Sequence, residues 1–247
     1  MLEVCVGSLA DAQAAAKAGA DRLELCSALE LGGLTPSLAL VEQVLGEVDL
    51  PVFVMARPRG GGFCYSSDET RCMRRDAELA LAAGASGIVF GFLNASGEVD
   101  AVRTGELVRL AGAQATVFHR AFDFVPNRSV ALDELIDQGV KRVLTTGGAT
   151  TAMDGADSLR RLIIQAKGRI EILPGGGVTA ANIADIVALS GCNQIHAGAS
   201  KGAIDDTLSA YSASSLCDLD RLSAGERRVV DKRLVAELVE ELSCIPE

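Results

Sequence analysis

Hydrophobic and polar positions along the chain follow one repeated order. A helical run closes on glycine, two or three residues form a link, and a β-branched apolar strand follows. This order recurs in four segments: KAGADRLELC (17–26), LAAGASGIVFG (81–91), DQGVKRVLTTGG (137–148) and LSGCNQIHAG (189–198). Glycine just past a helix end supplies the left-handed conformation of a C-cap, and a short link then delivers a strand. The repeat therefore predicts alternating helices and strands.

Four further apolar segments complete the strand pattern. They are LEVCV (2–6), DLPVFVMARPRG (49–60), AQATVFHRA (113–121) and GRIEILPGGG (168–177). Eight strands spaced by roughly 20 to 35 residues suit βα units, because parallel strands need long crossover connections. We predict a single-domain α/β fold over residues 1–247, a TIM-type (β/α)8 barrel. An open doubly wound sheet is the rival, but no GxGxxG follows the first strand.

The pattern also predicts where helices begin and where it loosens. The first helix starts at Ser8, in a Ser-x-x-Asp capping arrangement, and closes at Gly19. After the eighth strand a Ser/Asp-rich stretch predicts a long loop at about 201–225. Helical periodicity then resumes in GERRVVDKRLVAELVEEL, and the predicted inward stripe of this last helix is Val230, Leu234, Leu238 and Leu242.

Composition excludes several classes of partner. The chain carries 23 basic and 33 acidic residues, and no basic run is long enough to bind a polyphosphate, so nucleic acid is not expected. The N-terminus lacks the regions of a signal peptide, and the longest uncharged stretch, 79–93, is too short to cross a membrane. The seven scattered cysteines predict no disulfide framework. We expect a cytoplasmic protein without a membrane partner.

Strand alternation predicts which side chains face the lumen of the barrel. In LEVC and LELC, the pairs Glu3–Cys5 and Glu24–Cys26 each occupy one face, opposite Leu and Val. Active sites of such barrels gather at the C-terminal strand ends. If the apolar face packs against the helices, the barrel mouth collects Glu24, Cys26, Arg57, His119 and His196.

The segment ATVFHRAFD (115–123) ends an apolar strand in titratable groups. Histidine can exchange a proton near neutral pH or ligate a metal, so His119 is a candidate for either role. Charged groups that follow strands, among them Arg59 and Asp123, cost several kcal/mol if buried without a partner. Surface salt bridges are the alternative for these charges, and hydrogen-bonded packing is the alternative for His119.

A glycine turn follows the seventh strand. In LPGGGVTAANI, Gly175, Gly176 and Gly177 lead into a helix, whose free backbone N–H groups would form an anion seat. Barrels often place a phosphate after strands seven and eight. A tight turn would also require glycine, so both interpretations stay open.

Taken together, the motifs resemble the CutC family of copper homeostasis proteins. RLELCSALELGGLTPS, VFVMARPRGGGFCY, FHRAFD, RVLTTGG and ILPGGG carry the resemblance from about Val4 to His196. The resemblance implies a cytoplasmic TIM-type barrel that forms a homo-oligomer, a dimer or tetramer. It also implies Cu(I) binding through cysteines of the first two strands, which fall on Cys5 and Cys26.

Three functions compete at this stage. One is copper handling through the two cysteines. The second is an enzyme acting on a small anionic or phosphorylated molecule, with His119 and Glu24 exchanging protons and Asp123 orienting a base. The anion would be held by Arg57, Arg59, Gly175, Gly176, Gly177 and His196. No nucleophile elbow or HExxH motif appears, so the sequence does not name the reaction. The third is a scaffold without chemistry, which predicts an occluded mouth with every charge paired internally.

Overall fold

A parallel barrel forms the centre of the molecule. The computed structural model describes residues 1–204 and 226–245. In residues 1–204 the barrel strands are β1 (Leu2–Val6), β2 (Arg22–Leu25), β3 (Val52–Met55), β4 (Gly87–Phe90), β5 (Ala115–Phe118), β6 (Arg142–Thr145), β7 (Glu171–Pro174) and β8 (Ile195–Ala197). They pair in the order β7-β6-β5-β4-β3-β2-β1-β8, and a bridge between Gly175 and His196 links the two ends. The predicted TIM-type barrel is confirmed.

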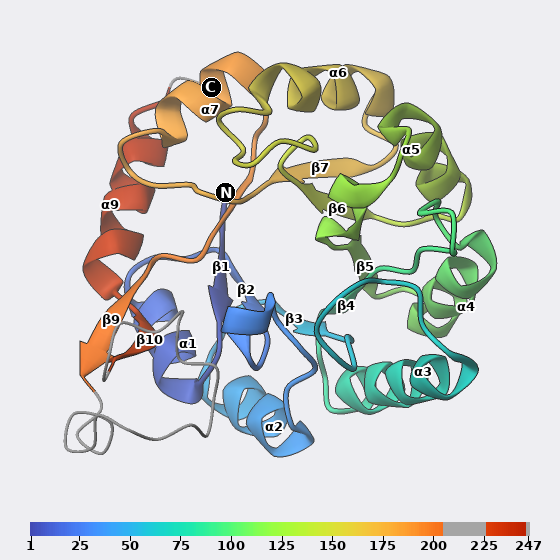
Figure 1. Cartoon of the computed structure of the whole chain (residues 1–247). Helices are drawn as coiled ribbons and strands as arrows, with labels where there is room; N and C mark the ends of the chain where they lie inside the picture. The colour runs from blue at the N-terminus through green and yellow to red at the C-terminus, as the bar shows by residue number, and fades with distance from the viewer. Residues whose placement is uncertain (205–225, 246–247) are drawn as a thin grey trace.

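Helices form an outer ring around these strands (Figure 1). In the described residues they are α1 (Leu9–Lys17), α2 (Leu38–Glu47), α3 (Ser67–Ala82), α4 (Ala101–Ala111), α5 (Arg128–Asp137), α6 (Ala156–Ala166), α7 (Ile183–Ser190) and α9 (Lys232–Ser243). Two 3₁₀ turns, η1 (Leu29–Leu31) and η2 (Arg120–Phe124), follow β2 and β5. The Ser8 side chain accepts a hydrogen bond from the Asp11 backbone N–H, which confirms the predicted start of α1.

The inside of the barrel is packed with side chains. Its apolar layer consists of Cys26, Phe53, Met55, Val89, Val117, Leu144 and Leu173. The alternate strand positions, such as Leu23 and Leu25, belong to the separate core between strands and helices. The alternation of faces expected from the sequence is therefore confirmed.

Charged side chains lie inside the barrel beneath this layer. Arg22 binds Glu3 at 2.5 Å, and Arg142 binds Glu171 at 2.5 Å. Both guanidinium groups face the ring of Phe53, with carbon-to-centroid distances of 5.8 and 5.1 Å. Pairing and stacking offset part of the desolvation cost of these buried charges.

The chain after β8 departs from the expectation of one long loop followed by one long helix. Residues Ser200–Ile204 form β9, which pairs antiparallel with β10 (Glu226–Val230). The predicted loop is thus wrong at 201–204, and its remainder, 205–225, lies outside the described residues. The segment expected to open the last helix is a strand because its residues gain backbone partners on β9, an interaction that helical periodicity cannot reveal.

Helix α9 begins only at Lys232 and completes the outer ring beside α1 (Figure 1). Its buried residues are Val235 and Leu238, whereas Leu234 is 37 % exposed. Of the predicted stripe, Leu238 is buried, Leu242 packs against the core and Val230 is buried in β10. Leu234 departs from the stripe because a step of four residues overshoots one helical turn by roughly 40°. Within the described residues, no helix is long and apolar enough to cross a membrane.

Candidate functional site

Two thiols meet where β1 and β2 end. Cys5 lies in β1, Cys26 directly follows β2, and their sulfur atoms are 3.9 Å apart. The parallel register pairs Cys5 with Glu24, so the two lumen-facing rows of β1 and β2 come side by side. The structure therefore brings together the two cysteines chosen from the sequence.

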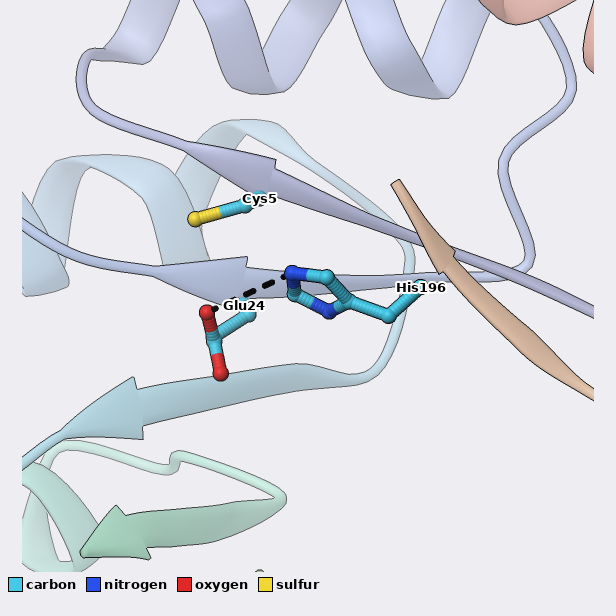
Figure 2. Close-up of side chains that lie close together, drawn as sticks. All are labelled: Cys5, Glu24 and His196. Atoms are coloured by element: carbon cyan, nitrogen blue, oxygen red, sulfur yellow. Dashed lines mark ion pairs between the residues drawn. The ribbon is translucent and has the colours of Figure 1, made fainter. Parts of the chain in front are cut away.

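A carboxyl group and an imidazole complete this thiol cluster, which we define as Cys5, Cys26, Glu24 and His196. Figure 2 shows Cys5, Glu24 and His196 pointing toward one another from β1, β2 and β8. The ligating atoms of these three side chains all lie within 4.8 Å of one another. The His196 Nε2 atom is 3.8 Å from Glu24 Oε2, which in turn is 3.7 Å from the Cys26 sulfur.

Glu3 supports the cluster from below. His196 Nδ1 donates to Glu3 Oε1 at 2.7 Å, and Arg22 binds the other carboxylate oxygen. Burial opposes ionisation of Glu3, but the hydrogen bond and charge of His196, together with Arg22, lower its pKa to about 2. Glu3 is therefore an anion that fixes the orientation of His196.

Protonation in the cluster follows from burial and from neighbouring charges. The hydrogen bond from Cys26 lowers the pKa of Cys5 to about 5, with help from His196 against burial. The same contact and burial raise the pKa of Cys26 well above its ordinary value. Burial, followed by the charge of Cys5, raises the pKa of Glu24. Burial alone would lower the pKa of His196, but its neighbours Glu24, Cys5 and Glu3 outweigh burial and raise it.

These directions describe one charge-balanced state at neutral pH. Glu3 and Cys5 are anionic and His196 and its neighbour Arg22 are cationic, while the raised pKa values of Glu24 and Cys26 favour their neutral forms. Two negative and two positive charges balance among side chains that are all buried except for Cys5, which is half-buried. Balanced charge is what a buried ionic cluster requires, because an uncompensated buried charge is strongly destabilising.

The other histidine lies in a different environment across the mouth. His119 follows β5, and its ring lies 5.0 Å from the ring of Phe63, centroid to centroid. The Arg57 guanidinium carbon lies 5.1 Å from the same Phe63 centroid. His119 Nδ1 accepts from the Ala121 backbone N–H at 3.2 Å. Within the described chain, His119 Nε2 and Arg57 Nε are buried without hydrogen-bond partners.

His119 is therefore a neutral ring with a hydrogen-bond donor around neutral pH. Burial, reinforced by the positive charge of Arg57, lowers its pKa to about 3. Because Nδ1 accepts a hydrogen bond, the proton of the neutral ring resides on Nε2. The side chain has the chemistry to bind an oxygen atom, whereas its expected role in proton exchange with Glu24 remains a prediction.

Arg57 holds two loops over the buried thiol. Its guanidinium donates to the carbonyls of Leu31, Gly33 and Gly61, at 2.9, 3.1 and 2.9 Å. A Cβ placed on Gly33 would lie 3.0 Å from the sulfur of Cys26, so this residue covers the thiol directly. Cys26 is consequently fully buried, whereas Cys5 is half-buried.

Other residues selected from the sequence have local partners. The Arg59 side chain binds Glu69 and is 41 % exposed. The Asp123 carboxylate accepts from Thr145 Oγ1 and the Thr146 backbone N–H, and it pairs with Arg120 at 2.9 Å. Asp123 therefore anchors η2 to the end of β6, and within the described residues no hydrogen bond or ion pair joins it to either histidine.

The glycine turn closes the barrel. Gly175 forms the bridge to His196, and an added Cβ there would lie 2.7 Å from Leu144 Cδ1. Gly176 and Gly177 have φ values of +104° and +71°, which favour glycine. The Gly177 carbonyl accepts from the Asn182 side chain. These contacts explain the glycines by backbone geometry, while a role in anion binding stays a prediction.

Sequence reasoning missed Glu3 and Phe63 as members of the mouth. Glu3 was placed on the lumen face with Cys5, but its pairing with His196 depends on β1 lying next to β8. That contact joins residues 193 positions apart, and a repeat pattern carries no signal for it. Phe63 lies in a loop, where periodicity gives no direction for a side chain.

Comparison with known proteins identifies the family. The sequence model of the CutC family matches residues 1–201. The chain belongs to the CutC family. A CutC family protein of Treponema denticola is 52 % identical over 200 residues, covering 81 % of each chain. The human copper homeostasis protein cutC homolog is 45 % identical over 199 residues, covering 81 % of this chain and 73 % of the human protein.

A solved structure of the family shares the barrel. The crystal structure of CutC from Streptococcus agalactiae superposes with a TM-score of 0.76 at 34 % identity. It covers 80 % of this chain and 98 % of its own. The family model matches up to residue 201, so β10 and α9 lie outside the matched residues.

Proposed function

We propose that this CutC protein binds Cu(I) between the sulfur atoms of Cys5 and Cys26, beside the imidazolium of His196. The proposal rests on the distance of 3.9 Å between the two sulfur atoms. Because this distance is less than twice a metal–sulfur bond of about 2.3 Å, one ion can contact both sulfur atoms. Thiolate sulfur donors suit a soft monovalent copper ion. The name of the human relative, a copper homeostasis protein, agrees with this function.

Charge balance favours a monovalent ion. Cys5 is already a thiolate, so only the proton on Cys26 has to leave before both sulfurs can bind. Replacing that proton by Cu(I) leaves the net charge of the buried cluster unchanged. A divalent ion would add one positive charge unless Glu24 also lost its proton.

Competition for Cu(I) tests the site. Reduced protein is titrated with Cu(I) against a chelator of known affinity, with Zn(II) as a parallel series. Cys26→Ser should weaken Cu(I) binding by more than roughly 100-fold, since even groups that only orient a ligand contribute 10- to 100-fold. Between the pKa values of the two thiols, affinity should rise about tenfold per pH unit because one proton is released.

The matched control is Cys72→Ser, which changes an exposed thiol on α3. It should bind Cu(I) as the unmodified protein does. Wild-type affinity in both Cys5→Ser and Cys26→Ser would refute the proposed ligands. Tighter binding of Zn(II) than of Cu(I) under the same competition would refute the preference for a monovalent ion.

A second candidate function is catalysis on a small molecule that carries a carbonyl, carboxylate or phosphate oxygen. It is favoured by the unpaired buried N–H groups of His119 and Arg57, because buried donors without partners are uncommon in folded proteins. The thiol cluster would supply the proton transfer, with Glu24 as the acid and Cys5 as the base.

Ligand-observed NMR with a panel of small carboxylates and phosphate monoesters tests this second function. His119→Asn keeps an acceptor for the Ala121 N–H but removes the Nε2 donor, so binding of any hit should weaken at least about tenfold. Arg71→Lys, in an exposed ion pair with Asp68 on α3, is the matched control. A panel without hits, or hits that bind equally to His119→Asn, would count against catalysis at this position.

A further inference from the structure

A cleft lies between α5 and α6, outside the barrel lumen. Its volume is about 360 Å³, large enough for a small metabolite. The residues that line it are Pro126, Asn127, Arg128, Ser129, Ser158, Arg161, Leu162 and Gln165. The lining includes two arginines and no acidic residue, although the whole chain has a net charge of −10. The cleft is therefore a local positive region on an acidic protein.

Arg128 is held in place by packing and not by a counter-ion. An added Cβ on Gly148 would lie 2.2 Å from Arg128 Nη1 and 2.3 Å from Cζ, so the guanidinium lies directly on that glycine. The Gly148 N–H is in turn fixed by Asp123 Oδ1 at 3.1 Å. Within residues 1–204 and 226–245, no hydrogen bond or ion pair engages the side chain of Arg128.

Arg161 and Ser158 face the cleft from α6. They are three residues apart, which places them on the same side of the helix. In the described part of the chain, neither side chain has a hydrogen-bond or salt-bridge partner. Three N–H or O–H bearing side chains, two of them charged, are thus available to one ligand in the cleft.

The wall of the cleft is fixed by hydrogen bonds between the two helices. Ser129 Oγ donates to Gln165 Oε1 at 2.9 Å, and Gln165 Nε2 donates to the Ser129 carbonyl at 2.8 Å. Arg128 is also the first residue of α5, where the helix dipole adds positive potential. A ligand would therefore meet a preformed site.

We propose that this cleft binds the phosphate group of a small phosphorylated molecule through Arg128 and Arg161. Guanidinium groups match the planar oxygen pairs of phosphate, and they form charge-assisted hydrogen bonds with it. The volume exceeds the needs of phosphate alone, which favours a phosphate monoester over the free ion. The site is separate from the thiol cluster and does not depend on copper binding.

Calorimetric titration of the full chain tests this proposal with two probes, inorganic phosphate and ribose 5-phosphate, at constant ionic strength. Saturable binding is expected, tighter for the sugar phosphate than for the free ion. Arg128→Gln and Arg161→Gln should each weaken binding at least about tenfold. Arg160→Gln, which changes an adjacent arginine of α6 outside the cleft, should bind as the wild type does.

Three results would overturn the proposed site or its ligand. Equal weakening by Arg160→Gln would show a general charge effect and overturn the site, as would the absence of saturable binding of both probes. Tighter binding of inorganic phosphate would replace the monoester by the free ion as the ligand. Cys26→Ser should leave phosphate binding unchanged, so failure of the copper site and failure of this cleft are distinguishable.

Discussion

The two histidines of the chain are both buried at barrel strands but have opposite protonation states. His119 follows β5 and His196 lies in β8, and they are 4 % and 9 % exposed. Acidic groups surround His196, so it carries a proton despite burial. Aromatic rings and Arg57 surround His119, so it is neutral. Both histidines are buried, so the difference in their protonation comes from their neighbours on other strands and loops.

This difference divides the mouth into two chemical halves. The half formed by β1, β2 and β8 balances charge among acids, thiols and His196, which suits exchange of a proton for a metal cation. The half formed by β3 and β5 offers neutral or cationic N–H donors, which suits an oxygen atom. One barrel opening thus combines a soft-metal site with a donor-rich site.

The largest effect is expected from Glu3→Gln, which removes the charge that both Arg22 and His196 share. Loss of one partner from a buried ion pair leaves uncompensated charge and costs about 3–5 kcal/mol. Urea unfolding at neutral pH measures the free energy of unfolding. Glu78→Gln, in a solvent-exposed pair with Arg75, is the control and should lose less than about 1 kcal/mol. Equal losses in the two variants would show that buried charge does not stabilise the half formed by β1, β2 and β8.

A smaller effect is expected from the pH dependence of His119→Asn. The pKa of His119 is depressed to about 3 in the folded state, from 6.5, so protonation below 6.5 favours the unfolded chain. Its contribution to stability is therefore full above pH 6.5 and is lost as pH falls toward 3. As the pH falls by about two units below 6.5, the free energy of unfolding of the variant should rise by roughly 2–3 kcal/mol relative to that of the wild type.

Unfolding curves at several pH values give this difference, and ring NMR provides an independent check. Because the chain contains only two histidines, both titrations can be assigned from His119→Asn alone. The His119 ring should stay neutral and the His196 ring protonated around neutral pH. A His119 ring that titrates near its ordinary pKa would remove the contrast between the two halves.

The smallest effect is expected at the loop that joins the halves. Gly33 has a φ of +83° and lies between Arg57 and the thiol of Cys26. Gly33→Ala should cost about 1–2 kcal/mol, from the strained backbone and the close sulfur contact. Gly62→Ala in the neighbouring loop meets no atom within 4 Å and should change the unfolding free energy little. Equal free energies of unfolding for the two variants would mean that Gly33 does not pack closely against the Cys26 thiol.

Much of the architecture could be predicted from the sequence because its signals are local. Glycine C-caps, β-branched runs and helix starts such as Ser8 each depend on a few adjacent residues. Alternation then places Cys5 and Cys26 in the lumen, and parallel pairing of consecutive strands brings them together. The pairing of β9 with β10 was missed because it joins two segments that are separated in the sequence, and a local pattern carries no signal for such a partner.

The sequence by itself determined the eight strands, the lumen face of each strand and the pair of thiols, because periodicity and neighbouring-strand order suffice for these. Only the tertiary structure decided the partners and the charge of the two histidines. Closure of the ring sets β8 beside β1, so that Glu3 meets His196, whereas the loop after β3 sets Phe63 and Arg57 against His119. Protonation of a buried group depends on such through-space neighbours, and these are fixed only when the barrel closes.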